Sequence, residues 1–211
     1  MITNDDRPDP AKGKLATRTY ADAYSDGHRT IADVPTYVAG YADFVLIDAM
    51  MTDYVMLDVG SGTGGFFRLA RNQSRIVSID FSPEMTTEAR RLGPVLGISR
   101  VEYECCKFED YRSDSLFDVV RLTGTFGWYQ PWRASVGSLQ KAAGLLNTGG
   151  LLAVSWVPPR TPFQWLKGKF FPSRTVIITD NALLKLVFEF GFELITRIDS
   201  SRSRVGIFRK S

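Results

Sequence analysis

The chain has 211 residues, of which 44% are hydrophobic and 23% are charged. These ordinary globular values fit a single α/β domain and exclude wholesale disorder and a coiled-coil rod. No apolar run approaches the roughly 20 residues that a membrane-spanning helix needs, so only peripheral contact with a membrane is compatible with the sequence. The net charge of +3 is too weak, without clustering, to indicate binding to nucleic acid.

Residues 1–14 are rich in aspartate and proline and lack an apolar core, which predicts a disordered tail rather than a secretory signal. Residues 15–211 are then expected to form one domain. Cys105 and Cys106 are neighbours that could close no useful loop and lack metal-ligand spacing. With a single histidine, His28, this composition favours a reduced, cytoplasmic protein and argues against a metal site.

Segments of strand and helix character alternate along the chain after an N-terminal helix at Pro35–Met51, which a flexible segment at 20–29 precedes. Five strands are predicted at Val55–Val59, Arg75–Ile79, Val101–Cys105, Phe117–Leu122 and Leu151–Val157. Helices are predicted at Gly64–Arg71, from an N-cap at Ser82 to a last turn at Arg90 and Arg91 before Gly93, at Pro131–Asn147 before a turn at 147–150, and from a cap at Asp180 to before Gly191. Phe192–Ile198 and Val205–Arg209 are expected to pair as a terminal hairpin. The alternation predicts a parallel sheet of βαβ units.

The strongest local signal is the glycine loop Leu57-Asp58-Val59-Gly60-Ser61-Gly62-Thr63-Gly64-Gly65, between a predicted strand and a predicted helix. Glycines let a backbone turn sharply and approach a ligand that a β-carbon would exclude. A second carboxylate, Asp80, lies at the end of the next strand, where it can accept hydrogen bonds from the two hydroxyls of a ribose. The pattern therefore predicts a ligand that contains a nucleoside.

Two ligands fit this pattern. Gly60, Gly62 and Gly65 satisfy the G-x-G-x-x-G spacing of a nicotinamide dinucleotide site. Asp58 argues against a dinucleotide, because a carboxylate at the mouth of the loop would repel a pyrophosphate by about 1 kcal/mol or more at about 4 Å. The same carboxylate would attract the ammonium and sulfonium groups of S-adenosylmethionine, which has a ribose and no phosphate.

The stretch from Val55 to Trp156 resembles the class I S-adenosylmethionine-dependent methyltransferases of the small-molecule branch. Four segments carry the resemblance in the family's order: VMLDVGSGTGG, IVSIDFSPEM, FDVV and LLNTGGLLAVSW. It implies an α/β, Rossmann-like, doubly wound sheet of seven strands, mostly parallel with a C-terminal antiparallel hairpin. That hairpin agrees with the one expected from the residues alone.

The resemblance also implies the cofactor site. Asp58 would lie near the amino group of the methionine part, Asp80 would bind the ribose, and Phe81 and Met85 would flank the adenine. The full cofactor set is Tyr20, Asp58, Gly60, Ser61, Gly62, Thr63, Gly64, Asp80, Phe81, Met85, Lys107, Phe108 and Thr123. Lys107-Phe108 stands where the family often has an acid followed by a small residue, which is a departure from the pattern.

Methyl transfer is an in-line displacement, so the protein must chiefly align the acceptor and exclude water. A general base is needed only where the acceptor loses a proton, and the candidates are His28 and Tyr129. Acceptor contacts are expected from Tyr24, Phe126, Trp128 and Trp165. The resemblance implies that residues 15–51 form a lid and helix, and the basic, aromatic stretch 158–179 is expected to shape the acceptor pocket or contact a membrane surface.

These observations favour a methyltransferase that uses S-adenosylmethionine to methylate O, N or C of a small aromatic or apolar acceptor. The loop after the fourth strand lacks the (Asn/Asp)-Pro-Pro-aromatic motif of nucleobase methyltransferases, which counts against a nucleic-acid target. Two alternatives stay open: an oxidoreductase that uses NAD, and a protein that binds S-adenosylmethionine without catalysis.

Overall fold

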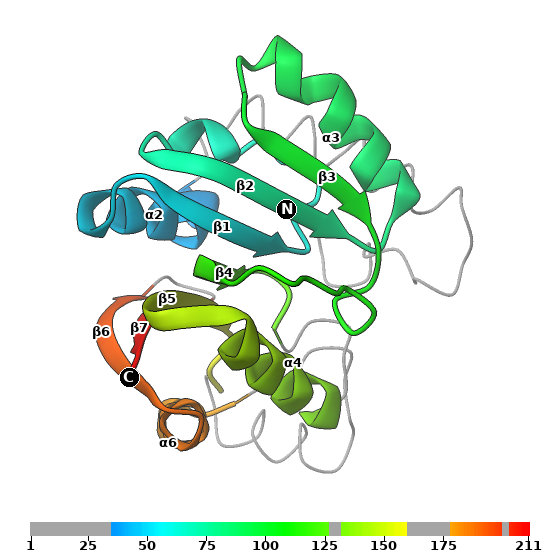
Figure 1. The fold of residues 1–211 in the computed structure, drawn as a ribbon. Coiled ribbons are helices and arrows are strands. Elements are labelled where there is room, and N and C mark those ends of the chain that lie inside the picture. The colour runs from blue at the N-terminus through cyan, green and yellow to red at the C-terminus, as the bar shows by residue number, and fades with distance from the viewer. Residues whose placement is uncertain (1–34, 127–131, 160–177, 200–202) are drawn as a thin grey trace.

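The structure is a computed structural model that describes residues 35–126, 132–159, 178–199 and 203–211 (Figure 1). Its strands are β1 (Tyr54–Val59), β2 (Gln73–Asp80), β3 (Val101–Cys105), β4 (Phe117–Leu122), β5 (Leu146–Trp156), β6 (Phe192–Asp199) and β7 (Arg204–Lys210). Its helices are α2 (Pro35–Met50), α3 (Pro83–Val95), α4 (Trp132–Leu145) and α6 (Asp180–Glu189), with a short 3-10 turn, η2 (Phe67–Leu69).

All seven strands join one sheet in the order β3-β2-β1-β4-β5-β7-β6. β1 pairs in parallel with β2 and β4, β2 with β3, and β4 with β5, whereas β7 runs antiparallel between β5 and β6. The predicted fold class is therefore confirmed, including the antiparallel hairpin.

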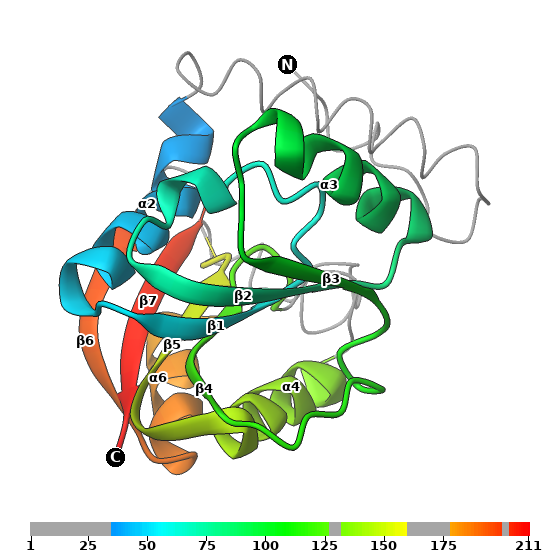
Figure 2. The same ribbon diagram turned by 45° about the horizontal axis from the view of Figure 1, so that its top comes forward.

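Helices cover both faces of the sheet, as Figure 2 shows, with α2 and α3 on one face and α4 and α6 on the other. Because side chains alternate along a strand, β1 sends Met56 to the α2 face and Leu57 to the α4 face, and both are fully buried. A parallel sheet covered on both faces needs nearly continuous apolar strands, which explains the apolar runs in the sequence. Among the described helices, none is both long and apolar enough to cross a membrane.

The helix predicted at Gly64–Arg71 is wrong: only the three-residue η2 forms there. Gly64 adopts a φ of +67°, which lies outside the helical region. Ala70 is already extended, because the chain must enter β2 at Gln73. The buried Phe67 ring anchors this short turn to the sheet and packs edge-on against Phe44 of α2.

The turn predicted at 147–150 is absorbed into β5, which begins at Leu146, and α4 ends at Leu145 rather than Asn147. Gly149 and Gly150 lie instead where the β4–β5 pairing changes register. Asp118 of β4 holds this region, because its carboxylate accepts hydrogen bonds from the Val55 backbone N–H at 2.9 Å and from Asn147 Nδ2 at 2.8 Å.

The boundaries of α3 and α6 also differ from the predictions. Ser82 caps α3 as expected, accepting a bond from the Met85 N–H at 3.2 Å, but the helix continues through Gly93 to Val95. The cap of α6 is Thr179, not Asp180: Thr179 is extended and its hydroxyl accepts from the Ala182 N–H.

Candidate functional site

The carboxyl ends of β1, β2 and β4 meet at one edge of the sheet, where open parallel sheets place their ligands. The glycine loop follows β1 at this edge. Its Gly60, Gly62 and Gly64 all have positive φ, at +69°, +59° and +67°. The N–H groups of Gly60 and Ser61 donate to the Ile79 carbonyl at 2.8 and 3.2 Å, which fixes the loop to the end of β2.

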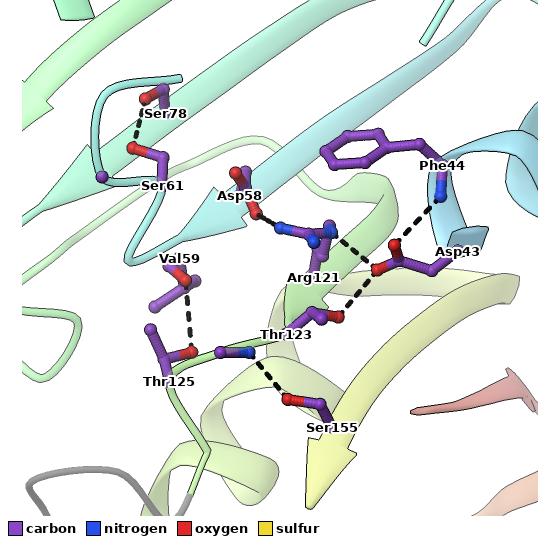
Figure 3. Close-up of polar contacts among 12 residues, drawn as sticks. Asp43, Phe44, Asp58, Val59, Ser61, Ser78, Arg121, Thr123, Thr125 and Ser155 are labelled. Carbon is purple, nitrogen blue, oxygen red and sulfur yellow. Dashed lines mark hydrogen bonds and ion pairs between the residues drawn. The ribbon is translucent and has the colours of Figure 1, made fainter. Parts of the chain in front are cut away.

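Packing inside the protein also requires a glycine at position 60. A β-carbon at this position would lie 1.8 Å from Thr125 Cγ2. Thr125 belongs to the loop after β4, and its hydroxyl donates to the Val59 carbonyl at 3.2 Å (Figure 3). The absence of a side chain at Gly60 therefore lets two loops pack together, a reason that is independent of any ligand.

Asp80 ends β2 with both carboxylate oxygens engaged by backbone. Oδ2 accepts from the Gly62 N–H and Oδ1 from the Ser82 N–H, each at 2.9 Å. Burial raises the pKa of Asp80, and the two N–H donors oppose that rise. Each carboxylate oxygen can accept a second hydrogen bond. Asp80 is thus a fixed acceptor pair, as its predicted role with a ribose diol requires.

Phe81 follows Asp80 and leaves 57% of its surface exposed, which is unusual for an aromatic ring and offers a flat apolar surface beside the carboxylate. Met85 lies in the first turn of α3 and is 5% exposed. The structure therefore makes Phe81 available to a planar ligand and places most of Met85 in the protein.

The loop after β3 carries the departure from the family pattern. Lys107 is exposed, whereas the Phe108 ring is 5% exposed and packs in the core on the α4 face. Lys141 of α4 donates to the carbonyls of Phe108, Glu109 and Tyr111, and its Nζ lies 5.1 Å from the centre of the Phe108 ring. The Phe108 side chain is therefore committed to packing, and its backbone is what remains for a cofactor.

Asp58, next to last in β1, is buried with 1% exposure and is not alone (Figure 3). Its Oδ1 accepts from Arg121 Nη1 at 2.9 Å, and Arg121 Nε donates to Asp43 Oδ2 at 2.7 Å. Thr123 Oγ1 donates to the same Asp43 oxygen at 2.7 Å, and the Phe44 N–H donates to the other at 3.1 Å. We call Asp43, Arg121 and Asp58 the charge network.

The charge network joins two carboxylates to one guanidinium inside the protein. Burial raises the pKa of Asp58 to about 6, against the opposing effect of Arg121, so Asp58 is ionised at pH 7. Burial lowers the pKa of Arg121, but Asp43 and Asp58 outweigh it and raise the pKa above its ordinary value.

The sequence predicts an acid at the mouth of the glycine loop, and the structure corrects this picture by pairing Asp58 with a cation. Arg121 and Asp43 were not predicted as site residues, although the sequence contains a signal for both. Arg121 is a lone charge in the otherwise apolar second half of a central strand, and Asp43 is an acid within an apolar helix. Charged residues in such places are almost never fully buried unless paired.

The other predicted site residues divide into two groups. Within the described residues, Ser61 shares a 2.7 Å hydrogen bond with Ser78, Thr63 is buried, Thr123 donates to Asp43, and Phe126 is 3% exposed in the core. Outside the described residues lie Tyr20, Tyr24, His28, Trp128, Tyr129 and Trp165. No cluster of three metal-binding side chains occurs in the part of the chain that the structure describes.

A glycine loop after the first strand, an acid after the second and an antiparallel strand inserted near the sheet edge together define the class I methyltransferase fold that the sequence resembles. Residues 56–150 match the family model described as a methyltransferase domain. The methyltransferase resemblance seen in the sequence is therefore confirmed over this stretch of the chain.

Among curated proteins, the chain is 32% identical over 103 residues to the malonyl-[acyl-carrier protein] O-methyltransferase of Acetivibrio thermocellus. The match covers 47% of this chain and 34% of that protein, so the chain spans about a third of the length of this relative.

Two solved structures share the fold over most of the chain. The N-methyltransferase NodS from Bradyrhizobium japonicum WM9 superposes with a TM-score of 0.67 at 14% identity, covering 84% of this chain and 98% of NodS. The magnesium protoporphyrin IX methyltransferase ChlM from Synechocystis PCC 6803, with S-adenosylhomocysteine bound, gives 0.66 at 17% identity, covering 94% and 100%.

Proposed function

We propose that this protein transfers the methyl group of S-adenosylmethionine to a small-molecule acceptor. The observation that carries the proposal is the arrangement at the end of β2, where Asp80 presents a backbone-fixed pair of acceptor oxygens next to the exposed ring of Phe81. A ribose diol and an adenine ring need these two features side by side. The methyltransferase family match over residues 56–150 supports this reading.

Each part of the cofactor meets a matching group. Asp80 accepts the ribose hydroxyls, Phe81 supports the adenine, and the positive-φ turns at Gly60, Gly62 and Gly64 shape the path of the methionine part. Asp58, in the charge network, receives the ammonium group of the methionine part. When bound, the cofactor supplies a methyl group on a sulfonium leaving group, and the protein aligns the acceptor with it and excludes water.

The same electrostatics separates S-adenosylmethionine from NAD. Pairing with Arg121 weakens the repulsion between Asp58 and a diphosphate, but the network holds two carboxyl groups against one guanidinium. Asp80 adds a second carboxylate at the same edge. A ligand with cationic groups is attracted here and a diphosphate is repelled.

The acceptor is a small aromatic or apolar molecule methylated at O, N or C. Its contacts are Tyr24, Phe126, Trp128 and Trp165. Where the acceptor must lose a proton, His28 or Tyr129 takes it. Residues 15–51 cover the cofactor, residues 158–179 shape the acceptor side or contact a membrane surface peripherally, and the protein works in the cytoplasm without nucleic acid.

Calorimetric titration with S-adenosylhomocysteine and with NADH tests the cofactor. Binding of the first and not the second is expected, and tight binding of NADH alone would overturn the proposal. Methyl transfer to a panel of phenols, amines and carboxylates then tests catalysis, since the relatives named above include an N-methyltransferase and an O-methyltransferase. Cofactor binding without transfer to any of them would indicate a non-catalytic binding protein.

A further inference from the structure

Arg121 has no role in the cofactor contacts described so far, yet it is a fully buried cation on a central strand. It lies directly opposite Asp58 in the parallel β1–β4 register, and both side chains point to the α2 face. Asp43 meets it from α2, and its Cζ lies 4.2 Å from the centre of the Phe44 ring. Desolvating a cation is unfavourable, so the surrounding groups must compensate for it.

The hydrogen bonds of Arg121 constrain its direction as well as its charge. Nε bonds Asp43 and Nη1 bonds Asp58, so two different nitrogens of one planar group are each fixed by a carboxylate. A lysine has a single nitrogen and cannot reproduce this geometry. The Asp58 carboxylate is thereby held by one oxygen, Oδ1, at the start of the glycine loop.

We propose that Arg121 is a positioning residue for the cofactor: it keeps the buried Asp58 carboxylate ionised and oriented to receive the ammonium group of S-adenosylmethionine. This inference rests on the proposed function and deepens it, because it assigns the affinity for the amino-acid part of the ligand to a residue outside the glycine loop.

The charges around Asp58 show why a cation is needed there. Asp43 of α2 and Asp80 of β2 both raise the pKa of Asp58, in addition to burial, and Arg121 of β4 opposes them. Without Arg121, the carboxyl would keep its proton at neutral pH. A neutral carboxyl cannot form an ion pair with an ammonium group, so the ligand would lose the interaction even though Asp58 is still present.

The test compares two ligands that differ only in the amino-acid part. S-adenosylhomocysteine carries the ammonium group, whereas 5′-methylthioadenosine has the same nucleoside and sulfur without it. Their affinities are measured by calorimetry from pH 5 to pH 9 for the wild type, Arg121→Gln and Arg121→Lys, with thermal unfolding of each variant to verify folding.

In the wild type, S-adenosylhomocysteine is expected to bind more weakly as the pH falls through about 6, because Asp58 becomes protonated. In Arg121→Gln, the pH at which half of this binding loss has occurred moves above 7. When this midpoint lies one pH unit above the assay pH, binding is about tenfold weaker. Arg121→Lys recovers part of the loss. The affinity for 5′-methylthioadenosine stays unchanged in both variants.

If Arg121→Gln does not fold, Asp43→Asn provides a second test, in which the midpoint is expected to shift in the opposite direction. Removing this like charge lowers the pKa of Asp58, so the midpoint for S-adenosylhomocysteine moves below its wild-type value. Equal weakening of both ligands, or a midpoint that stays in place in the variants, would overturn the role of Arg121. A wild type that binds neither ligand would instead overturn the proposed function.

Discussion

Asp58 and Asp80 stand near the ends of two adjacent strands, and both are buried, but they are held in different ways. Asp80 takes its hydrogen bonds from backbone N–H groups of the two segments beside it, Gly62 and Ser82. Asp58 depends on a side chain from β4, which in turn depends on Asp43 of α2. One carboxylate is positioned by the local chain, and the other by the tertiary structure.

The largest expected effect comes from removing Arg121, the side chain that holds Asp58. Arg121→Met leaves two buried carboxylates without their cation, which is expected to lower the free energy of unfolding by about 3–5 kcal/mol in urea denaturation. Arg75→Met is the matched control on β2, because the ion pair of Arg75 with Glu102 is exposed, and it should change stability by no more than about 1 kcal/mol. Equal losses in the two variants would show that the charge network contributes nothing special.

The second prediction concerns Asp80, the carboxylate that the backbone holds. Asp80→Ala should weaken the binding of S-adenosylhomocysteine by about 1.5–3 kcal/mol, measured by calorimetry, through loss of charge-assisted bonds to the ribose. Asp199→Ala removes an acid at the end of β6, far from the glycine loop in the sheet order, and should leave the affinity unaltered. An Asp80→Ala protein with wild-type affinity would mean that the ribose lies elsewhere.

The glycine loop connects the two carboxylates, and Gly60 tests its packing. Gly60→Ala and Gly97→Ala share a positive φ, but nothing lies within 4 Å of a β-carbon at Gly97. Gly60→Ala should therefore lose about 1–3 kcal/mol more unfolding free energy than Gly97→Ala, because of overpacking against Thr125. Adding Thr125→Ser, which removes Cγ2 and keeps the hydroxyl, should recover part of this excess; no recovery would point to another clash.

The smallest expected effect comes from Ser82, whose backbone and side chain have different roles. Its N–H bonds Asp80, whereas its hydroxyl caps α3. Ser82→Ala should destabilise the protein by about 1 kcal/mol in thermal or urea unfolding, with little change in cofactor affinity. Thr179→Ala removes the equivalent cap of α6 and is expected to behave alike. A selective fall in affinity for Ser82→Ala would show that the hydroxyl takes part in the site.

The contrast between the two carboxylates also explains what the sequence could predict. The loop at Gly60–Gly64, the acid Asp80 and the cap Ser82 lie within a short stretch, where residue type and spacing determine the geometry. Arg121 pairs with Asp58 and Asp43, which lie 63 and 78 residues before it in the sequence, and residue spacing does not encode contacts over such separations.

The element boundaries follow the same rule. Apolar runs located β1, β4 and the second half of β5, which are buried on both faces, whereas β3 and β6 alternate with charged residues and are partly exposed. The helix after the glycine loop was predicted from local pattern, but the positive φ of Gly64 and the early entry into β2 leave room only for η2. The start of β5 depends on pairing with Phe117 across the sheet, so the glycines at 149 and 150 could not reveal it.

The position of β7 has a consequence for biosynthesis. Among the described strands, β6 pairs only with β7, although it precedes β7 in the chain. During translation, residues 192–199 therefore have no backbone partner until residues 204–210 have left the ribosome and inserted beside β5. Until the hairpin docks, β5 presents an unsatisfied edge, and such edges are templates for aggregation.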